Sequence, residues 1–158
     1  MADLKLGLAQ GYWGAAPNPD FVGLAQEAEK LGFDSVWSAE AWGNDAFTPL
    51  CWIGAQTKKI KLGTAVVQLS GRTPTSCAMH ALSLDYLSNG RFMLGLGVSG
   101  PQVVEGWYGR PFPKPLARTR EYIDIIRPVS YTHLRAHETG RHISYAVFCL
   151  KKGGGGGG

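Results

Sequence analysis

The chain has 158 residues, and 16 Lys and Arg side chains against 12 Asp and Glu give it a formal net charge of +4. Residues 1–127 carry 12 basic and 11 acidic side chains, so most of the excess positive charge lies beyond residue 127. No cluster of Lys and Arg interleaved with aromatic residues occurs in residues 1–127, which argues against a nucleic-acid partner. Neither a signal peptide nor a run of about 18 apolar residues is present. We therefore expect a cytoplasmic protein with no membrane partner.

The N-terminal part of the sequence alternates short apolar strands with amphipathic helices. Residues 4–9 predict a strand. A helix follows in which apolar residues recur at helical spacing, with Asp20 as its predicted N-cap and Gly32 just past its end. Residues 34–38 predict a second strand and residues 47–57 a second helix. The pattern is that of successive βα units.

The same alternation continues toward the middle of the chain. The β-branched run 60–67 predicts a third strand, and Thr73 is suited to cap a third helix. Residues 90–100 predict a buried fourth strand that runs into a loop of small residues, which leave backbone N–H groups accessible. A last helix is predicted over residues 115–127, with Pro128 as its stop.

Four strands that alternate with four helices predict an α/β fold with a parallel sheet. Residues 95–100 match the Gly-x-Gly-x-x-Gly string of a dinucleotide-binding fold, but that string belongs after the first strand and here it follows the fourth. A (β/α)8 barrel needs about 250 residues. We therefore expect the N-terminal half of a (β/α)8 barrel, with the loops that follow its strands converging on one mouth.

The alternation of strand and helix patterns stops at about Pro128. Residues 128–139 and 143–150 resemble translated adapter DNA from sequencing libraries, and the final Gly run resembles homopolymer read-through. We interpret residues 1–127 as one truncated domain and residues 128–158 as a non-native tail that is expected to be disordered. No metal site is expected, because three of the four histidines fall in that tail.

Four segments at matching distances resemble the luciferase-like monooxygenase family, in particular its coenzyme F-420-dependent oxidoreductase branch. They are residues 32–37, 62–66, 72–74 and 90–97, and the resemblance extends over about residues 4–127. It implies a (β/α)8 barrel that binds a deazaflavin or flavin ring at its mouth. Such a ring carries the redox chemistry, while the protein positions its reactive carbon near the substrate.

The resemblance also implies which residues surround the ring. The family often has a bulge with a non-prolyl cis peptide at the end of the third strand, and the matching positions are about Ala65–Val66. The residues implied in cofactor binding are Ala65, Val66, Gln68, Gly97, Val98, Ser99 and Gly100. Three aromatic residues after the first two strands are candidate walls for the ring or the substrate: Tyr12, Trp13 and Trp42.

Glu40 is the candidate catalytic residue, because it matches a position where relatives often place an acid or a histidine near the ring. A carboxylate there could transfer a proton or bind a substrate hydroxyl group. The alternative is a helix-cap or surface carboxylate. Some deazaflavin enzymes have an Asp-His pair at this point, where this chain has Ala39 and Glu40, so the chain departs from the pattern of those relatives here.

Two further polar residues, Asp45 and Arg72, have simple structural interpretations. Asp45 is expected to cap the second helix. Arg72 could reach a phosphate near a helix N-terminus, although a solvent-exposed arginine is the simpler interpretation.

Three hypotheses about function follow from the sequence. The first is that the full-length parent is an F-420-dependent oxidoreductase that transfers hydride to or from a small organic substrate. The second is an FMN-dependent luciferase-like monooxygenase. The third is that the 158-residue chain is an inactive fragment, because four βα units leave the edges of the sheet unpaired. The sequence leaves the substrate open, and it leaves open whether the parent is a homo-oligomer.

Overall fold

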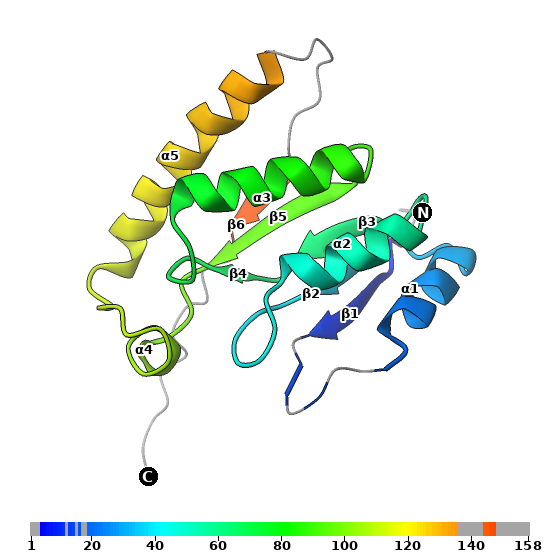
Figure 1. Ribbon diagram of the computed structural model, residues 1–158, viewed down its shortest axis with the longest axis horizontal. Coiled ribbons are helices and arrows are strands. Elements are labelled where there is room, and N and C mark those ends of the chain that lie inside the picture. Colours follow the sequence, from blue (N-terminus) through cyan, green and yellow to red (C-terminus); the bar gives the residue numbers. More distant parts are fainter. Residues whose placement is uncertain (1–3, 12, 15, 17–18, 136–143, 148–158) are drawn as a thin grey trace.

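A parallel sheet forms the centre of the fold in the computed structural model, which describes residues 4–11, 13–14, 16, 19–135 and 144–147 (Figure 1). The strand order is β1-β2-β3-β5-β4, and β6 also pairs with β5. Every described pairing is parallel. The strands are β1 (Gly7–Gly11), β2 (Ser35–Ser38), β3 (Lys61–Thr64), β4 (Val67–Gln68), β5 (Phe92–Gly97) and β6 (Ser144–Val147).

Helices pack against one face of this sheet, and the strand register explains why. Leu8, Val36, Leu62 and Phe92 align across β1, β2, β3 and β5, so they form one apolar row. Apolar side chains of the helices pack on this face in a single buried core. The helices are α1 (Phe21–Lys30), α2 (Phe47–Gln56), α3 (Pro74–Leu87), α4 (Pro101–Val104) and α5 (Pro115–Arg135). Burial of the apolar row therefore fixes which face the helices cover.

The opposite face of the sheet carries small residues beneath one large aromatic side chain. Ala9, Trp37, Gly63 and Met93 align across the strands. A Cβ atom on Gly63 would collide with the indole of Trp37, and one on Gly7 would lie 2.9 Å from the indole Nε1. Trp37 thus lies flat over two glycines, which leave it the room to do so.

The predicted strand 60–67 is interrupted, so that prediction was wrong in its detail. β3 ends at Thr64 and β4 begins at Val67, and the Ala65–Val66 peptide bond between them is cis. The Thr64 hydroxyl donates to the Gly95 carbonyl (2.9 Å) and accepts from the Gly95 N–H (2.8 Å). A side chain therefore satisfies the backbone of β5 where the neighbouring strand turns away from it.

The last helix does not end at Pro128, which corrects a second prediction. α5 continues to Arg135 with Pro128 inside it, although proline lacks the N–H that would bond to the preceding turn. Residues 144–147 form β6, parallel to β5. The rest of the segment after residue 135 lies outside the described residues. The non-native origin of residues 128–158 stays a prediction.

The three predicted helix caps had different outcomes. Thr73 accepts the Ser76 N–H at 3.3 Å and caps α3, as expected. Asp45 accepts the Phe47 and Thr48 N–H groups, both at 2.8 Å, so the predicted cap of α2 is confirmed. Asp20 lies at the N-cap position of α1, but its side chain makes no capping hydrogen bond. Within the described residues, the helices are too short or too polar to cross a bilayer, and the cytoplasmic location stays a prediction.

Glu29 on α1 joins that helix to the start of β3, and we predict a measurable effect of removing its charge. One carboxylate oxygen accepts the N–H groups of Lys58 (2.8 Å), Lys59 (2.5 Å) and Ile60 (2.9 Å). Burial alone would raise the pKa of Glu29, but these bonds lower it below its ordinary value of 4.5. Glu29→Gln should lower the free energy of unfolding by about 1 kcal/mol at pH 7.

The pH dependence of this effect follows from the direction of the pKa shift. A carboxylate whose pKa is lowered by folding stabilises the protein above its unfolded pKa and loses that contribution as the pH falls. The difference between Glu29→Gln and the unmodified chain should therefore shrink below about pH 4 in urea unfolding. Glu27→Gln is the matched control, because the Glu27 side chain, among the described residues, forms only an exposed pair with Lys30. An equal loss in both variants would contradict the prediction.

Candidate functional site

The carboxyl ends of the strands meet at one edge of the sheet, because the strands run parallel. In Figure 1 the arrowheads point toward α4 and the loop between β2 and α2. Backbone hydrogen bonds join the segments there: the Ala39 N–H bonds to the Gly11 carbonyl (2.8 Å) and the Ala65 N–H to the Ser38 carbonyl (2.7 Å). The Leu69 N–H bonds to the Gly97 carbonyl (3.0 Å). The predicted convergence of the loops is observed, and we call this edge the mouth.

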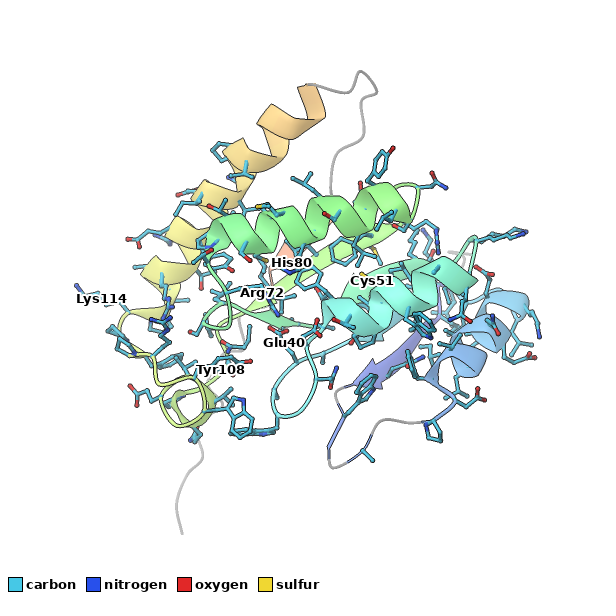
Figure 2. All side chains as sticks on the ribbon, viewed as in Figure 1. Glu40, Cys51, Arg72, His80, Tyr108 and Lys114 are labelled. Carbon is cyan, nitrogen blue, oxygen red and sulfur yellow. The ribbon has the colours of Figure 1, made fainter. Side chains whose placement is uncertain are left out.

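Glu40 is the best-connected side chain at the mouth. Its two oxygens accept from the Arg72 guanidinium at 2.8 and 3.1 Å, and Figure 2 shows the two side chains pointing toward each other. They also accept the backbone N–H groups of Ala46 (3.0 Å) and Gln68 (2.8 Å). The side chains of Glu40 and Arg72 are only 1% and 17% exposed. This carboxylate therefore joins three segments: the loop after β2, strand β4 and the loop before α3.

The arginine is held from several sides. Burial alone would lower the pKa of Arg72, but the hydrogen bonds and negative charge of Glu40 raise it above its ordinary value. Its guanidinium carbon also lies 5.2 Å from the centroid of the Phe47 ring. The expectation of a solvent-exposed Arg72 was therefore wrong. A planar, bidentate donor suits a carboxylate better than a lysine ammonium would.

A close approach between β4 and β5 shapes the floor of the mouth. Gln68 aligns with Gly97 in the strand register. A Cβ atom on Gly97 would lie 2.5 Å from Cγ2 of Val66, so only glycine leaves room for the valine there. The Gln68 side chain is buried: its oxygen accepts the Ser70 N–H at 2.9 Å, but its Nε2 has no hydrogen-bond partner among the described residues. A buried donor without a partner is costly.

The other predicted cofactor residues also lie at this edge. Val98, Ser99 and Gly100 follow β5 directly and are half-buried, and Ala65 is exposed beside the cis bond. Ser99 has φ = 59°, a left-handed conformation that a residue with a side chain adopts only when its surroundings hold it. The structure thus brings Glu40 together with the residues around the β4–β5 ends.

The three candidate aromatic walls are not equivalent. Trp42, 40% exposed, meets Trp107 edge to face with ring centroids 5.5 Å apart, so the loops after β2 and β5 are in contact. Trp13 instead packs against Phe21 (5.4 Å) and lines a hollow with residues of α2. Tyr12 lies outside the described residues.

Two positioning residues were missed by the sequence analysis. Asn44 accepts the Trp13 N–H (2.5 Å) and donates to the Ala39 carbonyl (3.3 Å), which joins the loops after β1 and β2. Tyr122 on α5 donates to the Arg72 carbonyl at 3.0 Å. For Asn44 the local signal was the neighbouring glycine, Gly43. Its φ of 105° and its position against the Trp13 carbonyl show why a glycine stands there. Nothing in the local sequence marks Tyr122.

Comparison with known proteins agrees with this geometry. The family described as "Luciferase-like monooxygenase" matches residues 7–148. The chain belongs to the luciferase-like monooxygenase family. The resemblance found in the sequence is therefore confirmed, and so is the predicted fold class, a parallel α/β sheet that forms part of a (β/α)8 barrel.

Individual relatives give more detail. A Mycobacterium tuberculosis protein, named provisionally as a coenzyme F-420-dependent oxidoreductase, is 66% identical over 128 residues, which cover 81% of this chain and 37% of that protein. A 5,10-methylenetetrahydromethanopterin reductase of Methanolobus tindarius is 38% identical over 65% of the chain and 32% of its own length. The chain therefore spans about a third of the length of these curated relatives.

A solved structure shows the same fold. The oxygenating constituent of 3,6-diketocamphane monooxygenase from Pseudomonas putida, a complex with FMN, superimposes with a TM-score of 0.66 at 22% identity. The match covers 77% of this chain and 38% of that one. At this identity the likeness shows the fold alone.

Proposed function

We propose that this chain forms part of the ring-binding mouth of an oxidoreductase that uses coenzyme F-420 and acts on a small organic molecule. The two curated relatives described above support the proposal, since one is named for the coenzyme and the other for the reduction of 5,10-methylenetetrahydromethanopterin. The observation that carries it is the buried Gln68 Nε2, which has no hydrogen-bond partner among the described residues and lies at the end of β4. When bound, the deazaflavin supplies hydride transfer.

The residues at the mouth fit such a ring. A deazaflavin is flat and carries carbonyl groups along one edge, which need donors such as the free Gln68 Nε2–H group. Gly97 has no side chain to obstruct the ring, and Val66 would present an apolar surface beside it. We propose that these residues and the backbone of residues 98–100 hold the ring, with Ala65 and Trp42 at its margins.

We propose that the main role of Glu40 is to hold the segments of the mouth together, and not to transfer a proton. Both of its oxygens already accept hydrogen bonds from Arg72 and from two backbone N–H groups. A proton donor needs a free path to substrate, and this carboxylate is enclosed. Proton transfer by Glu40 stays a prediction from the resemblance. A full-length Glu40→Gln enzyme that bound its coenzyme normally but lost one limb of its pH–rate profile would support it.

The alternative coenzyme is FMN, which one solved structure of the same fold contains. Titration of the chain with oxidised F-420 and with FMN, followed by the fluorescence of each ring, separates the two. We expect F-420 to bind at least tenfold more tightly. Preferential FMN binding without a response to F-420 would overturn the proposal, and binding of neither ring would favour the inactive-fragment hypothesis.

Gln68→Met should separate ligand binding from stability. The exchange removes the buried unpaired donor and keeps a side chain of similar length, while the Ser70 N–H that loses its acceptor is half-buried. We expect the free energy of unfolding to change by less than about 1 kcal/mol while F-420 affinity falls about tenfold. Ser70→Ala is the control, because it leaves the Gln68 amide intact. Unchanged affinity in Gln68→Met would exclude the proposed hydrogen bond.

A further inference from the structure

A second recess lies beside the mouth, between α3 and α5. It has a volume of about 540 Å³ and is lined by the loop before α3, the first residue of α3, Arg110 and one face of α5. Figure 1 shows α5 running alongside the N-terminal end of α3. Tyr122 closes the floor, because its hydroxyl donates to the Arg72 carbonyl and keeps the two elements together. A recess of this volume can hold a small polar group and part of the molecule that carries it.

Two guanidinium groups line this recess with most of their donors unused. The Arg110 side chain makes no hydrogen bond or ion pair with any described residue, and the Arg118 side chain makes one hydrogen bond to a described residue, the Pro111 carbonyl, at 3.3 Å. Arg72 also lines the recess, but Glu40 neutralises it. Glu121 is the acidic residue of the lining, and it forms no ion pair with either free arginine among the described residues. The recess therefore carries excess positive charge.

The chemistry of arginine restricts what this charge would bind. A guanidinium presents parallel N–H donors that match the oxygen pairs of phosphate and carboxylate groups. Two such groups around one concave surface favour an anion with several oxygens. The positive end of the α3 helix dipole adds to the same field, although Thr73 already caps one of its N–H groups.

We propose that this recess is an anion site, in which Arg110 and Arg118 bind a phosphate or carboxylate group. The loop that bounds it begins at Leu69, directly after Gln68 at the mouth. A ligand whose flat part lies at the mouth can therefore extend an acidic end into the recess. That orientation rests on the proposed function, whereas the anion site itself does not. Two sources share this chemistry: free phosphate, and the phosphorylated end of a cofactor or substrate.

The test is calorimetric titration of the 158-residue chain with sodium phosphate, against sodium chloride at equal ionic strength. Arg118→Gln and Arg110→Gln should each weaken phosphate binding at least fivefold, and the double variant more than tenfold. Arg120→Gln is the matched control, since Arg120 is exposed on the same helix and does not line the recess. Circular dichroism checks that each variant keeps its helices. Equal binding by the double variant, or no phosphate binding by the unmodified chain, would overturn the proposal.

A competition experiment between phosphate and the ring cofactors identifies the source of the anion. If the acidic end of a ring cofactor occupies the recess, F-420 or FMN should displace phosphate, and the deazaflavin core or riboflavin without phosphate should not. If the recess takes free phosphate, or the phosphate of a substrate, ring and phosphate should bind together. Phosphate binding that survives a failure of every ring to bind would leave the anion site standing while favouring the inactive-fragment hypothesis for the mouth.

Discussion

Replacing Arg72 by alanine is expected to lower the free energy of unfolding by about 3 kcal/mol. The exchange leaves the Glu40 carboxylate, 1% exposed, without its bidentate partner. An uncompensated buried charge is far more costly than the loss of an exposed pair. The remaining bonds from Ala46 and Gln68 are too few to replace it. Chemical denaturation at pH 7 measures the change.

A double-mutant cycle separates the ion pair from the loss of packing. Glu40→Gln combined with Arg72→Met should recover part of the stability lost in Arg72→Met alone, because no isolated charge remains. The matched control is Lys61→Ala, which breaks the partly exposed pair with Asp34 and should cost less than about 1 kcal/mol. Similar losses from Arg72→Ala and Lys61→Ala would show that the Glu40 pair is no more important than a surface ion pair.

Gly97→Ala should damage the mouth more than any other single-methyl change among the residues proposed to hold the ring. Its new Cβ would lie 2.5 Å from Val66 Cγ2, so the valine or the strand must move. Such overpacking costs about 1–3 kcal/mol. Because Val66 is proposed to face the ring, F-420 affinity should fall at least tenfold as well. Denaturation and fluorescence titration measure the two effects.

A compensating change makes this prediction specific. Val66→Ala removes the methyl groups that a side chain at position 97 would meet, so the Gly97→Ala, Val66→Ala double variant should recover most of the lost stability. Gly100→Ala is the control: its nearest neighbour is the end of the flexible Gln102 side chain, at 3.1 Å. Additive losses in the double variant would mean that the close contact at Gly97 does not limit the mouth.

The sequence predicted the features that depend on local pattern. The apolar strands, the Thr73 cap and the glycine-rich end of β5 follow from spacing and residue type, and parallel strands oblige their carboxyl ends to share one edge. The cis bond at Ala65–Val66 was implied by the family resemblance and is confirmed. The β-branched pattern alone did not predict this interruption, because a side-chain hydroxyl replaces the backbone ladder there.

The partners of the charged residues could not be predicted in the same way. Glu40 and Arg72 are 32 positions apart, and no periodicity records that their side chains meet. Each had a plausible local role, one as a helix cap and the other as a surface cation. Their pairing is a property of the folded chain, because the loop after β2 reaches β4 and the loop before α3 at the mouth. For Pro128 a local rule gave the wrong result: proline was expected to end the helix, but α5 continues past it to Arg135.

The indole of Trp37 has a consequence for how this part of the family can vary. It occupies the volume that side chains at positions 7 and 63 would need, so these three positions cannot change independently. A homologue with a larger residue at 63 should carry a smaller one at 37, and a homologue that keeps the tryptophan should keep both glycines. The size of one aromatic group thereby sets a shared evolutionary constraint on three strands.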